Sequence, residues 1–391
     1  MIRSLYLGWR YIVRHRLKAG ILVASITVIF YLPGALSQLV AQSAEGLTAR
    51  AIATPLMLGA RGSPLELTLS SLYFQSRTPQ LLRFGALSEI DSELARSIPL
   101  YVRFKSRQFP IVGTNLEYLE FRGLRLRAGR RFAVLGECVV GSSVAEELEL
   151  APGRTVVSSP ETVFDLAGTY PLEMNVVGVL EPTGTPDDQA IFVDIKTTWI
   201  IEGLGHGHQD LESAAAASAV LARNEGSITA NASLVEFNRI TDANRDSFHF
   251  HGDLSEYPIS AAVAIPHEQK SGVMLEGRLQ QHEQVQIIRP VDVMNELLAT
   301  VFTVQRYVIA AIVLVGAATV ATTVLVFLLS YRLRREEIDT LTKIGGSRSS
   351  IALVVGSEVI FVLLLSSLLA FVATELTSFA GTWMLVGLFV E

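Results

Sequence analysis

The sequence predicts a membrane protein. It should have an α-helical transmembrane bundle of three spans plus a short fourth apolar run, with a large α+β extracytoplasmic domain between spans one and two. Half of the 391 residues are hydrophobic and only 18% are charged, with a mean hydropathy of +0.39. This balance is too apolar for an ordinary soluble protein and too polar for membrane spans alone. The apolar residues also gather in a few long uncharged runs, with Lys and Arg beside them.

The uncharged runs define the spans. Ala19 to Ala44 holds 26 residues without a charge, and Tyr307 to Tyr331 holds 25. Crossing a hydrocarbon core of roughly 30 Å takes about 20 helical residues, so both runs are long enough. A third run, Ser349 to Thr374, is interrupted only by Glu358, whereas the 15 residues at 376–390 are short for a full crossing.

The predicted segments follow from these runs and from the charges between them. They are a cytoplasmic amphipathic helix at 1–19, span one at 20–41, the extracytoplasmic domain at 42–300, a stalk end and span two at 301–331, a cytoplasmic loop at 332–350, span three at 351–374, and an apolar tail or partial fourth span at 375–391.

The placement of Lys and Arg predicts which side of the membrane each segment faces. Five basic residues and no acid lie within 1–19, and the loop at 332–350 carries five more basic residues. Basic residues close to span ends stay in the cytoplasm, so both segments should be inside and residues 45–300 outside. That outer region holds 21 Lys and Arg against 32 Asp and Glu, a net charge of −11. An acidic outer domain and basic cytoplasmic edges agree with one topology.

A cleaved signal peptide is the alternative interpretation of the first apolar run. The run is longer than a usual signal-peptide core, and the basic segment ahead of it is also long. The segment VAQSA at 40–44 is a poor match to an A-x-A cleavage site. The sequence therefore favours an uncleaved span.

Short apolar runs bounded by turn residues fill the outer region and predict an α+β domain with a mixed sheet. The predicted strands are at 109–114, 138–141, 155–159, 174–180 and 190–195, and the predicted helices are at 142–150 and 211–223. A further helical pattern at 290–306 continues without a breaker into the second span.

Several functional classes lack their sequence signatures. There is no G-x-x-x-x-G-K-[ST] phosphate-binding loop and no G-x-S-x-G nucleophile elbow, so neither ATP hydrolysis nor serine hydrolase chemistry is expected of this chain. A net charge of −6 disfavours nucleic-acid binding. Cys138 is the one cysteine, so no intramolecular disulfide or Cys-based zinc site can form, and we expect a small buried core residue there.

The order of the residues in the loop at 332–350 predicts helices, which its composition alone does not. Residues 334–343 have the pattern of a helix that continues out of the second span, with acidic and basic residues at i,i+4 spacing. Gly345-Gly346 should end that helix, since glycine adopts the left-handed conformation without steric cost, and Ser347 can cap a second helix. The alternative is a solvated loop that only satisfies the positive-inside rule.

The motif R-x-R-R-E-E-I-x-x-L-x-x-I-G-G-S-R at 332–348 resembles the cytoplasmic loop of MacB/FtsX-type permeases, also called type VII ATP-binding-cassette (ABC) transporters. The basic lead-in at 12–18 resembles the segment that precedes span one in that family. GECVVGSSVAEELELAPGRTV at 136–156 and MNVVGVLEPTGTPDDQAIFVDI at 174–195 resemble the family's periplasmic core. The family normally has a fourth span and a basic cytoplasmic C-terminus. The last residues here depart from that pattern, so we expect a truncated or re-entrant fourth segment and a C-terminus outside.

The resemblance implies that the loop holds a coupling helix which docks on a separate cytoplasmic ABC ATPase subunit. ATP and Mg²⁺ would be bound by that partner, and no cofactor by this chain. The family further implies a homodimer in a bacterial inner membrane, with a periplasmic adaptor or lipoprotein as an additional partner. The coupling residues implied are Arg334, Arg335, Glu337, Ile338, Leu341, Ile344, Gly345, Gly346, Ser347 and Arg348.

Two functions within the family and one outside it fit the sequence. The first is a mechanotransmitting permease for efflux or export of an unidentified substrate. The second is an FtsX-like regulator of an extracytoplasmic enzyme, although the outer domain of such regulators is generally smaller. The third is a membrane-anchored binding or sensor protein without an ATPase. Co-purification with an ATPase would discriminate the first two from the third.

Glu358 is an intramembrane carboxylate, which is costly to bury and often functional. The family often has a glutamate at this place early in span three. A proton or ion site is one interpretation. Contact with the interface, or with an arginine across a dimer, is the other.

Two histidine pairs invite a metal hypothesis. His249 and His251 alternate in FHFHGD, with Asp253 next in the same alternation, and His206 and His208 repeat the spacing in GHGH. Imidazole and carboxylate groups bind zinc or copper. Exposed or structural histidines are the alternative, because two-residue spacing is common by chance.

Overall fold

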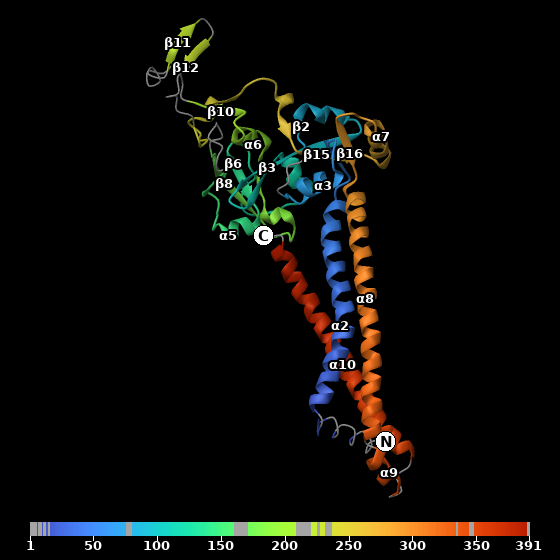
Figure 1. Ribbon diagram of the computed structural model, residues 1–391. Coiled ribbons are helices and arrows are strands. Elements are labelled where there is room, and N and C mark those ends of the chain that lie inside the picture. Colours follow the sequence, from blue (N-terminus) through green and yellow to red (C-terminus); the bar gives the residue numbers. More distant parts are fainter. Residues whose placement is uncertain are drawn as a thin grey trace. The chain divides into compact units, whose positions relative to one another are not determined.

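The computed structural model describes residues 6, 10, 13–14, 16–75, 80–159, 171–208, 220–224, 227–230, 237–333, 335–343 and 348–388 (Figure 1). The chain divides into two compact units. The helical unit takes Met1–Leu47 and Glu296–Phe389, and the sheet unit takes Thr48–Asn295. The division falls inside two helices, α2 (Arg16–Ile52) and α8 (Pro290–Leu333).

The helical unit contains α2 (Arg16–Ile52), α8 (Pro290–Leu333), α9 (Arg335–Lys343) and α10 (Arg348–Leu388). By length and composition, three stretches among the described residues could cross a membrane: Arg16–Ile52, Pro290–Leu333 and Gly356–Ala380. The helix predicted at 290–306 is confirmed as the start of α8.

Two helices run past the span ends that the charge pattern suggested. α2 continues through Pro33 to Ile52, and α10 continues through Glu375 to Leu388. A charged residue ends an uncharged window but does not end a helix, because exposed Glu is a good helix former. The boundaries at 41 and 374 are therefore changes of composition and not helix ends.

Small and hydroxyl-bearing residues bring the long helices together. A Cβ at Gly316 of α8 would lie 3.0 Å from Ile29 of α2. The hydroxyls of Tyr31 and Thr377 are 2.8 Å apart and join α2 to α10. Close backbone approach at small residues and interhelical hydrogen bonds are the usual means by which membrane helices associate.

Large apolar side chains remain exposed on the outer faces of these helices, for example Leu314 at 74% and Leu365 at 44%. A soluble monomer seldom exposes so continuous an apolar surface. Lipid contact satisfies such a surface, since the backbone of a helix makes its own hydrogen bonds.

Within the described residues, the sheet unit is built on one mixed ten-stranded sheet. Its strands are β1 (Leu56–Ala60), β3 (Ala95–Ser106), β4 (Phe109–Thr114), β5 (Leu126–Gly129), β6 (Glu137–Val140), β7 (Thr155–Val157), β8 (Glu173–Leu180), β9 (Ile191–Asp194), β15 (Ala261–Pro266) and β16 (Val285–Ile288). The order is β16-β1-β15-β3-β4-β9-β6-β8-β5, with β7 beside β8. The pairs β4–β9 and β6–β8 are parallel and the others antiparallel.

Both faces of the sheet are buried. Along β3, Leu100 contributes to one hydrophobic cluster and Tyr101 to the other, because successive side chains point to opposite faces of a strand. Cys138 is fully buried in the core, as predicted, and burial raises the pKa of its thiol.

Short helices and ribbons complete the sheet unit. The helices are α3 (Pro64–Leu72), α4 (Leu116–Phe121), α5 (Ser142–Glu147), α6 (Ile195–Ile201) and α7 (Gln269–Leu279), with 3-10 turns η1 (Phe84–Glu89), η2 (Pro186–Gln189), η4 (Arg245–Ser247) and η5 (Leu254–Glu256). The two-stranded ribbons pair β2 (Leu82–Arg83) with β14 (Pro258–Ile259), β10 (Gly205–Gly207) with β13 (Phe248–Phe250), and β11 (Val220–Asn224) with β12 (Ser227–Ala230).

The five predicted strands are confirmed as β4, β6, β7, β8 and β9, and the helix predicted at 142–150 is confirmed over Ser142–Glu147. The helix predicted at 211–223 is wrong at its end, where Val220–Asn224 forms β11, and 211–219 lies outside the described residues. Pairing with β12 overrides the helix preference of nearby alanines.

Candidate functional site

The predicted coupling loop is described only in part. Its two helices are present as α9 and the start of α10, and they hold the backbone of Arg335, Glu337, Ile338, Leu341 and Arg348. The other predicted coupling residues lie outside the described residues, and they are Arg334, Ile344, Gly345, Gly346 and Ser347.

Glu358 lies near the start of α10 and its residue is only 5% exposed. The carboxylate is therefore enclosed within the helical unit of a single chain. Its neighbour Ser357 is 1% exposed, so this stretch of α10 is packed on that side.

A buried charge cluster, the Arg50 cluster, lies within the sheet unit and connects the last turn of α2 with α4 and η2. It consists of Arg50, Tyr118, Arg122 and Asp187. Arg50 donates from Nη1 to Asp187 Oδ2 at 2.5 Å and from Nη2 to Oδ1 at 2.9 Å. Arg50 Nη2 also donates to the Tyr118 hydroxyl at 2.8 Å. A two-pronged Arg–carboxylate pair fixes both distance and orientation.

The charges of Arg50 and Asp187 stabilise each other. Burial alone would raise the pKa of Asp187, but the charge and hydrogen bonds of Arg50 outweigh burial and hold that pKa below its ordinary value. Burial raises the pKa of Tyr118 to about 12, so its hydroxyl stays protonated and donates to Asp187 at 3.0 Å. Burial lowers the pKa of Arg122. The side chains of Arg50 and Asp187 are only 5% and 2% exposed.

The turn that presents Asp187 is held by its neighbour Asp188. The Asp188 carboxylate accepts the backbone N–H groups of Thr183 at 2.9 Å and Gly184 at 2.7 Å. Gly141 packs against the backbone of this turn, where an added Cβ would lie 2.2 Å from the Asp188 carbonyl oxygen. The two segments that carry the family resemblance in this region therefore meet at this turn. The sequence did not predict the Arg50 cluster, because its members are far apart along the chain.

A second site, the histidine ribbon, consists of β10 and β13 with their flanking residues, 205–208 and 248–251. The strands are antiparallel, and His206 lies directly opposite His249. Ligand nitrogens of His206, His208 and His249 all lie within 4.8 Å of one another. The ring of His251 is 4.7 Å from that of His249 and 4.9 Å from that of His206, measured between centroids.

Alternation explains why four imidazoles gather on one face of this ribbon. The other face carries glycines on β10 and phenylalanines on β13. A Cβ at Gly205 would lie 2.5 Å from the Phe250 ring, and one at Gly207 would lie 2.5 Å from the Phe248 ring. Phe248 is buried in the core, and Phe250 packs edge-on against Trp199. The aromatic face therefore anchors the ribbon and leaves the histidine face outward.

Tyr257 holds both strands of the ribbon at one end. Its hydroxyl lies 3.0 Å from the carbonyl oxygen of Leu204, just before β10, and 2.8 Å from that of His251, just after β13. The four predicted histidines are thus brought together by pairing that sequence spacing could not reveal.

Asp253 does not join the histidines as the strand alternation suggested. β13 ends at Phe250, and Gly252 turns the chain with a φ of +85°. The Asp253 carboxylate instead accepts from the backbone N–H of Ser255 at 2.9 Å and caps η5. This bond holds the pKa of Asp253 below its ordinary value.

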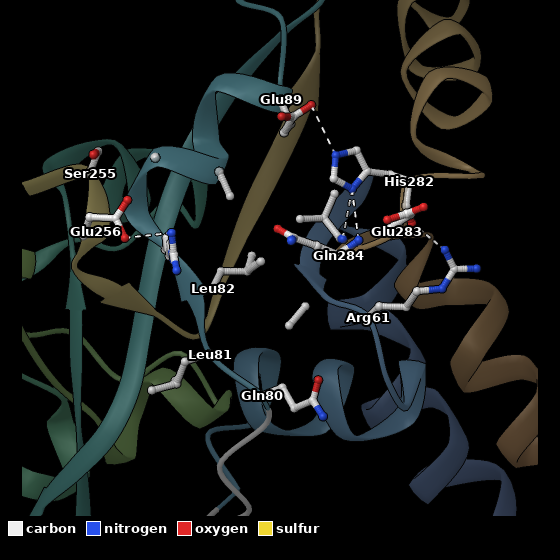
Figure 2. Close-up of a pocket in the computed structure, with 15 residues that line it drawn as sticks. Arg61, Gln80, Leu81, Leu82, Glu89, Ser255, Glu256, His282, Glu283 and Gln284 are labelled. Atoms are coloured by element: carbon white, nitrogen blue, oxygen red, sulfur yellow. Dashed lines mark hydrogen bonds and ion pairs between the residues drawn. The ribbon is translucent and has the colours of Figure 1, made fainter.

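An open pocket of about 650 Å³ lies elsewhere in the sheet unit (Figure 2). Arg83 and Glu256 form an ion pair at 2.8 Å on one side, and His282 lies 3.9 Å from Glu89 on the other. Arg61 donates to the carbonyl oxygen of His282. Side chains of both charge signs line the pocket, among them Arg61, Arg83 and Glu283.

The fold and these sites define a chain with three helices able to cross a membrane and a mixed-sheet domain. The family model of the MacB-like periplasmic core domain matches residues 20–234, just over half of the chain. The chain belongs to this family, the MacB/FtsX-type ABC transporter permeases.

Two transporter domains are among the solved structures that resemble the chain. One is the extracellular domain of the ABC-type transporter YknZ from Gram-positive bacteria, with 13% identity, a TM-score of 0.31, and coverage of 60% of this chain and 98% of that one. The other is the periplasmic region of MacB from Actinobacillus actinomycetemcomitans, with 11% identity, a TM-score of 0.35, and coverage of 66% and 97%. Both scores are below 0.5, so the family assignment depends on the family model. No curated protein matches the chain.

Proposed function

We propose that this chain is the membrane-spanning permease subunit of an ABC transporter that is driven by a separate cytoplasmic ATPase. The match of residues 20–234 to the MacB-like core is the observation that carries the proposal. The coupling motif at 332–348 supports it, because the motif lies in a basic segment between two helices able to span the membrane. The chain lacks a phosphate-binding loop, so ATP and Mg²⁺ belong to the partner.

The proposed mechanism is mechanical coupling. Nucleotide binding closes a pair of ATPase subunits, and α9 with the start of α10 receives that movement on the cytoplasmic side. α2 and α8 are each continuous from the helical unit into the sheet unit. The Arg50 cluster fixes the last turn of α2 to the core, so a displacement of that helix moves the sheet unit with it. Such a two-state rigid element can transmit movement without a wide pore.

The proposed assembly is a homodimer in a bacterial inner membrane. The sheet unit lies outside the cytoplasm, and a periplasmic adaptor or lipoprotein is a further partner. The exposed apolar faces of α8 and α10 supply surface for lipid and for a second copy. We place the basic segments 1–19 and 332–350 in the cytoplasm.

An FtsX-like regulator of an extracytoplasmic enzyme is the second candidate within the family. It would use the same ATPase and the same coupling segment, but would transport nothing. The ten-stranded sheet and its two buried faces favour the permease, because regulators of that kind generally carry a smaller outer domain.

Co-purification with an ATPase tests the proposal. The full chain is extracted from bacterial membranes in mild detergent, and bound subunits are identified by mass spectrometry. Ile344→Asp changes a motif position, whereas Thr340→Asp changes an exposed position of α9 that the motif leaves free. We expect the wild-type chain and Thr340→Asp to retain an ABC ATPase, and Ile344→Asp to lose it. A wild-type chain that retains no nucleotide-binding subunit would overturn the proposal and favour an anchored sensor.

A further inference from the structure

We propose that the histidine ribbon is a binding site for a divalent transition-metal ion of the Zn²⁺ class. His206, His208 and His249 supply the ligands, and His251 lies beside them. The proposal concerns the sheet unit alone and does not depend on the ATPase coupling proposed above.

The spacing of the imidazoles suits one ion. Zn–N bonds of about 2.0–2.1 Å in tetrahedral geometry place two ligand nitrogens about 3.3 Å apart. The Nε2 atoms of His206 and His251 are 3.5 Å apart, close to that separation. The ligand nitrogens of the main trio lie within 4.8 Å of one another, so small rotations of the rings would bring them onto one centre.

A backbone hydrogen bond prepares His249 as a ligand. Its Nδ1 lies 2.9 Å from the carbonyl oxygen of Ser247. A carbonyl oxygen only accepts, so Nδ1 carries the proton and Nε2 keeps its lone pair. Metal-binding histidines in proteins almost always donate their other ring N–H in this way, which fixes the tautomer and the ring orientation.

Side-chain packing and hydrogen bonds hold the two strands that carry the histidines. Phe248 and Phe250 close over Gly207 and Gly205, and the Tyr257 hydroxyl contacts the chain at the ends of both strands. A preformed frame of this kind reduces the ordering cost of binding. The three main ligands are half-buried and His251 is exposed, so an ion can enter from solvent.

The donor set selects the class of ion. Imidazole nitrogen suits zinc, copper and nickel, whereas calcium and magnesium require oxygen ligands. Asp253 is engaged at the cap of η5. A site made of imidazoles therefore discriminates Zn²⁺ from Mg²⁺ and Ca²⁺.

Zn²⁺ titration of the full chain in detergent tests the proposal. The protein is purified through a tag without histidine, stripped with a chelator, and titrated in competition with a chromophoric chelator. We expect one Zn²⁺ per chain, with no displacement by excess Mg²⁺ or Ca²⁺. The double variant His206→Ala/His249→Ala should weaken binding by more than the roughly 10- to 100-fold that loss of an outer partner costs.

Matched controls separate binding from folding. His267→Ala removes an exposed histidine that contacts Ser92 and lies outside the ribbon, and it should bind Zn²⁺ as the wild type does. Protection of the buried Cys138 thiol reports that each variant remains folded. The proposal is overturned if the wild type does not bind Zn²⁺ in this competition. It is equally overturned if the folded double variant binds as tightly as His267→Ala.

Discussion

Replacing Asp187 with alanine should destabilise the sheet unit severely, because it leaves the Arg50 guanidinium buried without its charge partner. The side chains of these two residues are only 5% and 2% exposed. Arg50 would lose both of its hydrogen bonds to the carboxylate and retain the one to Tyr118. The movement of α2 proposed above depends on this attachment.

The loss of stability in Asp187→Ala follows from the burial of the ion pair and from its hydrogen bonds. Two hydrogen bonds to a charged group contribute about 1.5–3 kcal/mol each, and removing one member of a buried ion pair costs about 3–5 kcal/mol. One kcal/mol shifts the unfolding midpoint of a domain of this size by about 2–4 °C, so Asp187→Ala should lower it by about 6–20 °C. The double variant Arg50→Met/Asp187→Leu should lose much less than the two single variants together, because no buried charge remains unpaired.

The chain carries its own probe for this assay. Cys138 is its one cysteine and is buried in the sheet unit, so the temperature at which a thiol-reactive fluorophore labels it reports unfolding of that unit. Glu256→Ala, which breaks the exposed pair with Arg83, is the control and should shift the midpoint by no more than about 4 °C. A midpoint for Asp187→Ala equal to that of the control, or a double variant that loses as much as the two single variants together, would show that an unpaired Arg50 does not destabilise the sheet unit.

Two more predictions concern the same region. Gly141→Ala should cost about 1–3 kcal/mol by overpacking against the Asp188 carbonyl, whereas Gly62→Ala, which meets no atom within 4 Å, should be neutral in the thiol assay. Acid should also destabilise the sheet unit. Hydrogen bonds from Arg130 and the backbone outweigh burial and hold the pKa of Glu137 below its ordinary value of 4.5, and that of Asp187 is held below 3.8. A carboxyl group whose pKa is lower in the folded state than in the unfolded state stabilises the fold at a pH above its ordinary pKa. This stability is lost as the pH falls through the pKa of the folded state. The temperature of the wild-type unfolding midpoint should therefore fall as the pH is lowered below about 4.5. The midpoint of Asp187→Asn should fall less steeply with pH. Equal slopes for the two proteins would contradict a lowered pKa of Asp187.

Much of the fold could be predicted because its signals are local. The length of the uncharged runs predicted the long helices, and apolar runs such as 174–180 predicted strands of the sheet. β3 was not predicted, since Arg96, Pro99 and Arg103 interrupt its apolar pattern. The strand forms because antiparallel partners on both sides supply its hydrogen bonds. The helices α2 and α10 extend beyond the predicted span boundaries at 41 and 374, because those boundaries followed composition, which does not determine where a helix ends.

The sites were predictable only where residues close in sequence share a face. The pair at His249 and His251 is visible from alternation, and so is the pair at His206 and His208. Their meeting is not visible, because it depends on antiparallel pairing across a long segment. The Arg50 cluster was missed entirely, since an arginine in the last turn of α2 and an aspartate in a distant turn carry no shared periodicity.

The side of the membrane on which α9 lies decides whether it can receive the movement of a cytoplasmic ATPase. Thr340→Cys and Gly62→Cys place exposed thiols on α9 and on the sheet unit, while Cys138 stays buried. With a membrane-impermeant maleimide on intact spheroplasts, we expect Gly62→Cys to be labelled and Thr340→Cys to be labelled only after the membrane is opened. Labelling of Thr340→Cys from outside intact cells would contradict a cytoplasmic coupling segment and the account built on it.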